Sequence, residues 1–141
     1  KKVGDVAKDT GLGADEIRKF AEIGLIHIGE RDGGEWLNQR NVRIMEIIAQ
    51  TRADGFTPDI GYTIESYEIY PQMIELLARR AVVGFNSRLG DKLDQPSAAK
   101  LAVNGIRTLS EMVPLMLIDR IVRDVEKVSA SGVLPTEEDE V

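Results

Sequence analysis

The sequence contains no cysteine and a single histidine, His27. The first absence excludes disulfides and thiolate metal sites, and one imidazole cannot build a His-rich metal centre within one chain. We therefore expect neither a metal nor another cofactor, and the lack of cysteine is consistent with a cytoplasmic protein. No run approaches the length of about 20 apolar residues that a membrane helix requires, so no membrane partner is expected.

Motifs of the common enzyme classes are also missing. The sequence has no P-loop, no G-x-G-x-x-G after a strand and no H-E-x-x-H. Catalysis by a Ser/His/Asp triad would have to recruit His27, which we interpret as an outward-facing strand residue between Ile26 and Ile28. The carboxylates single out no acid–base pair. The sequence therefore predicts no catalytic residue, and we expect that the protein is not an enzyme.

Acidic residues outnumber basic ones by 24 to 18, and residues 1–70 alone hold nine basic and thirteen acidic side chains. Affinity for nucleic acid comes mostly from neutralised phosphates, so DNA binding would need a local basic patch. The alternative is that the basic residues are solvated charges scattered over helix faces. The candidates for a patch are Lys8, Arg18, Lys19, Arg31, Arg40, Arg43 and Arg52.

The first 25 residues show the pattern of two short helices joined by a tight turn. Val3, Val6 and Ala7 lie three and four residues apart, as on one face of a helix. Residues 10–13 contain two glycines and predict a sharp turn. A second amphipathic helix is expected over residues 14–23, ended by Gly24. The pattern predicts a helix-turn-helix, which is too small to bury a core alone.

The next segment predicts a hairpin and then a third helix. Two short apolar runs flank Asp32-Gly33, a dipeptide favoured in tight hairpin turns, and this hairpin is a plausible wing. We interpret Trp36 as its packing anchor. Asn38 can cap a helix that runs through Asp54, and Gly55 ends it.

The second half of the sequence predicts long helices. A short helix is expected over residues 59–67 after Thr57-Pro58, followed by helices over 71–92 and 97–128. The two long helices should pair antiparallel, with Pro114 kinking the second one. Residues 112–118 are apolar nearly all round, which favours burial on more than one side and a second copy of the chain as cover. Residues 129–141, rich in acids, are expected to be disordered.

The order of these elements resembles the MerR family of bacterial transcription regulators. The residues that match the family's pattern are Val3-Gly4-Asp5-Val6-Ala7, Thr10-Gly11-Leu12, Ile17-Arg18, Gly24-Leu25, Arg31, Gly33, Val42 and Gly55-Phe56. Members usually carry aromatic-aromatic-Glu after Ile-Arg, where this chain has Lys19-Phe20-Ala21. In the wing they usually carry Gly-Tyr-Arg, where this chain has Gly33-Gly34-Glu35. Glu35 has the wrong charge for a phosphate, so either the register differs or Arg31 and its neighbours hold DNA.

The resemblance implies a mainly α protein: a winged helix-turn-helix with a small β-hairpin wing, then long C-terminal helices that form a helical hairpin and a dimer interface. It implies a homodimer that binds double-stranded DNA and acts on RNA polymerase by distorting a promoter. Arg18 and Lys19 would contact DNA from the recognition helix and Arg31 would grip phosphate. The full set of DNA-binding candidates is Lys8, Arg18, Lys19, Arg31, Arg40 and Arg43.

We expect a DNA-binding domain over residues 1–69, a helical dimerisation and effector region over 70–130, and an acidic tail over 131–141. Any effector should be organic and largely apolar, seated near Pro114 among Phe85, Met112 and Met116, although each of these side chains taken singly is more typical of core. The alternative function is a helical protein-interaction module whose winged helix no longer binds DNA. A gel-shift titration against salt separates the two functions.

Overall fold

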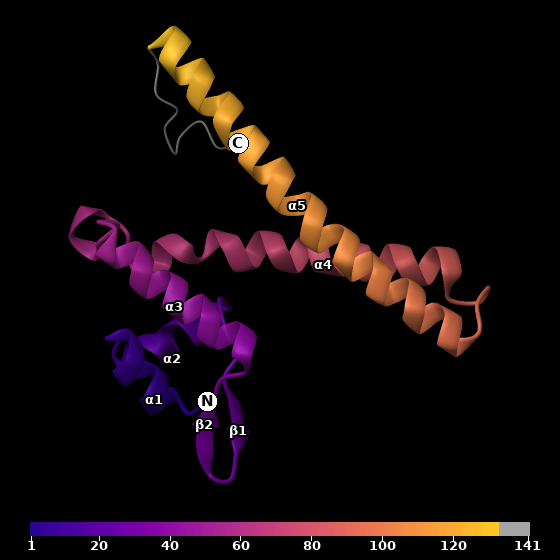
Figure 1. Cartoon of the computed structure of the whole chain (residues 1–141), viewed down its shortest axis with the longest axis horizontal. Coiled ribbons are helices and arrows are strands. Elements are labelled where there is room, and N and C mark those ends of the chain that lie inside the picture. Colours follow the sequence, from indigo (N-terminus) through magenta and orange to yellow (C-terminus); the bar gives the residue numbers. More distant parts are fainter. Residues whose placement is uncertain (133–141) are drawn as a thin grey trace. The chain divides into compact units, whose positions relative to one another are not determined.

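The computed structural model describes residues 1–132. The chain is mainly helical and contains a two-stranded antiparallel hairpin and a long C-terminal helix, as Figure 1 shows. It divides into two compact units, Lys1–Val82 and Val83–Val141, and the boundary falls inside a helix.

Two short helices open the first unit, as the spacing predicts. Helix α1 spans Val3–Thr10 and helix α2 spans Ala14–Glu22. Gly11 between them has φ 77°, a left-handed conformation that glycine adopts without steric cost. The core of the unit consists of Val3, Val6, Leu12, Ile17, Phe20, Ile26, Leu37, Met45, Ile48 and Tyr67. Residues at helical spacing therefore bury one face of each helix against a common core.

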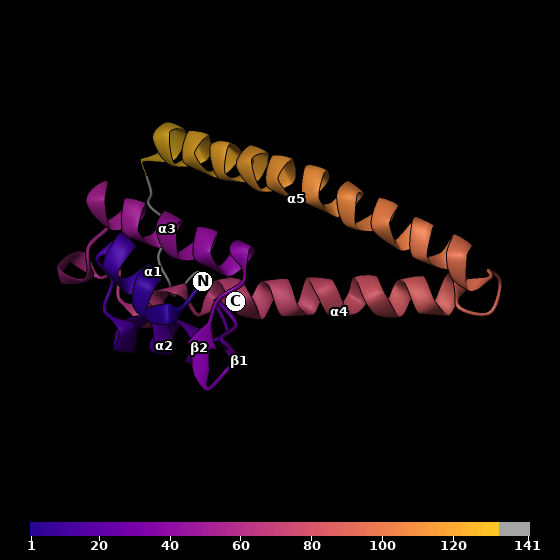
Figure 2. The same ribbon diagram turned by 60° about the horizontal axis from the view of Figure 1, so that its bottom comes forward.

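The hairpin follows, with β1 at Gly29–Arg31 and β2 at Gly34–Trp36. Asp32 and Gly33 have φ 51° and 74°, the positive values that a tight two-residue hairpin turn requires. Both views show the hairpin projecting from α1, α2 and α3 (Figures 1 and 2). The start of the chain extends this sheet, because Lys2 pairs antiparallel with Trp36. The hairpin predicted around Asp32-Gly33 is confirmed.

Helix α3 spans Gln39–Ala53, and the Asn38 side chain accepts a hydrogen bond from the Asn41 backbone N–H at 2.9 Å. This cap confirms the predicted start. The single short helix expected over residues 59–67 is wrong. Two 3₁₀ turns occur there, η1 at Pro58–Ile60 and η2 at Ile64–Tyr67, because Gly61 between them adopts φ 101° and interrupts the helix.

The two long helices exist with shifted ends. Helix α4 spans Ile69–Leu89 and α5 spans Gln95–Ser131, continuing through Pro114. Residues 129–131, expected to be disordered, are helical, and residues 133–141 of the expected tail lie outside the described part of the chain. No described residue of α4 or α5 is buried. Residues 112–118 are not buried within one copy of the chain, and their expected cover by a second copy stays a prediction.

Helix α5 carries two apolar faces on opposite sides. In its first half the half-buried residues Ala98, Ala102, Leu109 and Val113 recur at helical spacing. After Pro114 the apolar residues that recur are Ile118, Ile121, Val122 and Val125, all about half exposed or more. Leu109 and Ile118 are nine residues apart, about two and a half helical turns, so these faces point in opposite directions. One neighbouring helix cannot cover both faces.

By length and composition alone, α5 is apolar enough to cross a membrane, with a mean hydropathy of 1.3 over its most apolar 18 residues. The sequence has no continuous apolar run long enough to cross a membrane. Charged residues such as Arg107 and Glu111 interrupt this stretch of α5. One such helix is weak support for a membrane span, because the core helix of a soluble protein has the same character.

Candidate nucleic-acid interface

The hairpin sorts its side chains by charge onto two faces. The register places Glu30 opposite Glu35 and Arg31 opposite Gly34, while Lys2 pairs with Trp36. Successive strand residues point to opposite sides of a sheet. Glu30 and Glu35 therefore share one face, and Lys2, Arg31 and Trp36 share the other. We call the second set the cationic face of the hairpin.

Trp36 organises this cationic face. Its Nε1–H donates a hydrogen bond to the Arg31 backbone oxygen at 3.0 Å. The Arg31 guanidinium carbon lies 4.4 Å from the centre of the Trp36 ring, and Lys2 Nζ lies 5.7 Å from it. Cations at such distances from an indole are held by its electron-rich face. The tryptophan thus holds two positive charges in place and, as expected, anchors the hairpin.

The acidic face of the hairpin engages α2 through Arg18. Arg18 Nε donates to both carboxylate oxygens of Glu35 at 3.0 and 3.2 Å, and Nη2 donates to Oε1 at 2.7 Å. Nη1 donates to Asp15 Oδ1 at 2.6 Å. The guanidinium is thus shared between two carboxylates. We call this set, Arg18 with Glu35 and Asp15, the Arg18 clasp.

Electrostatics strengthens the clasp in both directions. Hydrogen bonds from Arg18, aided by its charge, hold the pKa of Glu35 below its ordinary value of 4.5. The hydrogen bond to Glu35 likewise raises the pKa of Arg18 above its usual range. Both groups are therefore charged at neutral pH, and a ligand that uses Arg18 must compete with two carboxylates.

Three of the remaining sequence candidates have no ion-pair partner among residues 1–132: Lys8 on α1, Lys19 on α2 and Arg40 on α3. Arg43 pairs with Glu46 at 3.3 Å within α3. The structure joins neither Arg40 nor Arg43 to the Arg18 clasp. Lys19 is consequently the unpaired cation that lies beside Arg18 on α2.

Arg52 does not belong to a surface patch. Its side chain is only 20% exposed, and Nη1 donates to Glu16 Oε1 at 2.7 Å. The guanidinium carbon lies 6.0 Å from the Phe20 ring centre. The expectation for Arg52 is therefore wrong, because packing against the core places this charge inside an ion pair between α2 and α3.

The residues expected to seat an effector are not gathered around an enclosed cavity. Met112 and Met116 line a hollow of about 630 Å³ whose walls all come from α5, together with Arg107, Thr108, Glu111 and Leu115. Phe85 does not line it and lies half-buried on α4. Within residues 1–132 no three His, Asp or Glu side chains are grouped to hold a metal ion.

Sequence reasoning missed Lys2 and the part that Trp36 plays in holding cations. Lys2 reaches the cationic face through pairing with a residue 34 positions away, and no local pattern signals such a contact. The acidic charge of Glu35 in the expected wing was visible in the sequence. Its partner was not, because the Arg18 clasp joins residues 17 apart in sequence.

These features are the available guide to function. Comparison with family models, curated proteins and solved structures finds no match for this chain.

Proposed function

We propose that the protein is a DNA-binding transcriptional regulator that acts as a homodimer. The observation that carries this proposal is the combination of α1, a glycine turn and α2 with a hairpin whose cationic face is organised around Trp36. The same order of elements occurs in winged helix-turn-helix domains, in which the second helix enters the major groove, and this likeness supports the proposal. The MerR resemblance adds RNA polymerase at the promoter as the partner of the bound regulator.

Within the proposal, α2 and the hairpin have separate tasks. Lys19 and Arg18 lie exposed on α2, where they would meet base edges or phosphates. Arg31 and Lys2 on the cationic face would bind the phosphate backbone of DNA. The Trp36 ring would limit the positions of both charged groups. Arg31 thereby takes the phosphate role that Glu35 cannot perform.

The second apolar face of α5 supports the dimer. Ile118, Ile121, Val122 and Val125 are 48% to 59% exposed, and no described residue of their own unit buries them. Contiguous apolar surface of this kind marks an interaction site. The polar side of the same segment is satisfied internally, since Arg120 pairs with Asp124 and Arg123 with Asp119. We propose that α5 of a second copy of the chain covers this apolar face.

The test is selection of bound sequences from a pool of random duplexes, followed by anisotropy titration of a selected duplex at several salt concentrations. Lys19→Ala should weaken binding, whereas Lys100→Ala on α5 should not. Arg31→Ala should weaken binding to all sequences alike and reduce the salt slope by about one. If Lys19→Ala and Arg31→Ala both bind the duplex as tightly as the parent protein, the proposed DNA interface is wrong.

One observation favours a second function. In the Arg18 clasp, two carboxylates bind the arginine that the MerR resemblance assigns to DNA. Residues 1–70 also carry a net negative charge. A protein-interaction module would keep this clasp closed and would show no salt-dependent binding to duplex DNA. Failure of the selection to enrich any sequence, combined with an intact fold, would favour this module.

A further inference from the structure

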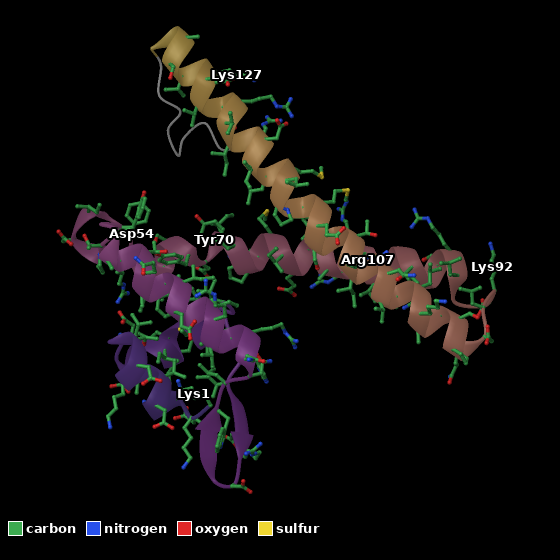
Figure 3. The ribbon with its side chains drawn as sticks, in the orientation of Figure 1. Lys1, Asp54, Tyr70, Lys92, Arg107 and Lys127 are labelled. Carbon is green, nitrogen blue, oxygen red and sulfur yellow. The ribbon has the colours of Figure 1, made fainter. Side chains whose placement is uncertain are left out.

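A groove of about 510 Å³ lies in the first unit between the end of α2, the middle of α3 and the first turns of α4. Its walls are mainly apolar, from Ile23, Leu25, Ile44 and Ile74, with one aromatic ring from Tyr70. Figure 3 marks Tyr70 on the first part of α4. The volume falls within the range of about 300–1,000 Å³ typical of small-molecule sites.

Gly24, just after α2, lines this groove together with Pro71 of α4. It has φ 86°, and a Cβ atom at this position would lie 3.6 Å from Cβ of Pro71, which also lines the groove. A larger side chain at this position would be strained by the positive φ and would extend toward the Pro71 wall.

Acidic residues are the only charged residues in the first turns of α4 and in the segment before it. Between Ala53 and Ala78 the sequence has five acidic residues and no Lys, Arg or His. Glu75 is the charged residue among the described residues that line the groove. Its Oε1 accepts a hydrogen bond from Arg79 Nη2 at 2.6 Å, but both side chains are about two-thirds exposed. Exposed pairs of this kind are weak, so the carboxylate remains available to a second cation.

We infer that this groove binds a small organic cation with an apolar body. The isoleucines and Leu25 would contact the body, and the ring of Tyr70 with the carboxylate of Glu75 would face the positive charge. Aromatic rings attract organic cations through their electron-rich faces, and a carboxylate adds direct attraction. A neutral ligand would gain only the apolar contacts, and an anion would be repelled by Glu75.

The site differs in place and chemistry from the hollow on α5 near Met112 and Met116. Its walls come from α3, α4 and the segment after α2, whereas the hollow is lined by one helix. The inference does not depend on DNA binding, because every residue that carries it lies outside the Arg18 clasp and the cationic face. A failure of either proposal would therefore leave the other standing.

The test uses the full chain with labelled isoleucine methyl groups and two probes of matched size and opposite charge, tetraphenylphosphonium and tetraphenylborate. The cation should shift the methyl signals of Ile23, Ile44 and Ile74, and the anion should not. Glu75→Gln should weaken binding of the cation by up to about fivefold, the worth of a surface ion pair. Glu65→Gln on η2, outside the groove, should leave the affinity unchanged.

A second pair of variants tests the apolar wall. Ile74→Lys places a positive charge in the groove and should abolish binding of the cation, whereas Met73→Lys on the neighbouring position should not. Both side chains are more than half exposed, so both variants should fold. Equal binding of both probes, or no methyl shift at millimolar cation, overturns the inference. Ile74 signals that move on dilution but not on addition of cation would assign the groove to contact between copies and overturn it too.

Discussion

Arg18 of α2 and Glu35 of β2 are joined by three hydrogen bonds, the shortest being 2.7 Å from Nη2 to Oε1. Glu35, which stands where the proposed MerR resemblance would place an arginine, thus lies against the arginine that we propose to read DNA. A carboxylate and a phosphate both accept hydrogen bonds from a guanidinium in the same forked geometry. Glu35 therefore accepts the hydrogen bonds that the Arg18 guanidinium could otherwise donate to a DNA phosphate.

We predict that Glu35→Gln raises the affinity for a selected duplex several-fold, because Arg18 no longer has to leave a charged partner. The measurement is anisotropy titration at low salt. Glu30→Gln is the matched control, since Glu30 lies directly opposite Glu35 on β1 but makes no hydrogen bond to Arg18. An equal gain in both variants would mean that removing negative charge, and not opening the clasp, changed the affinity.

The clasp should also open in acid. The folded pKa of Glu35 is held below its ordinary value of 4.5, so its contribution to stability is fully present above that value. This contribution is lost as the pH falls through the lowered pKa. Carboxyl carbon NMR of Glu35 should show a titration midpoint below 4.5, and Arg18→Gln should return the midpoint toward that value. A midpoint that does not respond to Arg18→Gln would refute the assignment of Arg18 as the cause.

Tyr67 should make the protein sensitive to alkali. It is 8% exposed, its hydroxyl has no protein partner among the described residues, and burial raises its pKa above the ordinary 10.0. The folded protein favours the neutral form of Tyr67. The contribution of this neutral form to the free energy of unfolding is present below pH 10 and is lost as the pH rises through the raised pKa. Urea unfolding should show a smaller alkaline loss in Tyr67→Phe than in the parent. Tyr70→Phe, at an exposed ring, should behave like the parent.

Tyr67→Phe should cost little at neutral pH. The ring keeps its edge contact with Phe20, whose centroid lies 5.9 Å away, and a buried hydroxyl without a partner is removed. Removing such a group is neutral or stabilising by up to about 1 kcal/mol. A loss of more than 1 kcal/mol in the urea experiment would show that the hydroxyl makes a favourable hydrogen bond in solution.

The second apolar face of α5 should decide the oligomeric state. Ile121→Glu places a charge in the middle of that face and should convert a dimer to a monomer in sedimentation velocity. Lys127→Glu, on the charged side of the same helix, should leave the dimer intact. A monomeric parent protein at micromolar concentration would contradict the proposed homodimer.

Local patterns in the sequence determined the elements of the first unit. The turn at Gly11, the hairpin around Asp32-Gly33 and the cap at Asn38 each depend on residues within a few positions, and each appears as predicted. Local chemistry was less decisive at Gly61, where the spacing of Ile60 and Ile64 favoured one helix and two 3₁₀ turns form instead. The observed break follows from a backbone angle that the sequence permits but does not require.

Contacts between distant residues were decided only by the tertiary structure. Charge and spacing showed that Arg18, Glu35 and Arg52 were present, but the packing of α2 against the hairpin joins the first two, and packing of α3 on the core draws Arg52 to Glu16. The groove at Tyr70 likewise exists because α3, the start of α4 and the segment after α2 come together there. A charged side chain of this length can reach many partners from one backbone position. The fold selects among them, because burial and hydrogen-bond geometry favour one arrangement over the others.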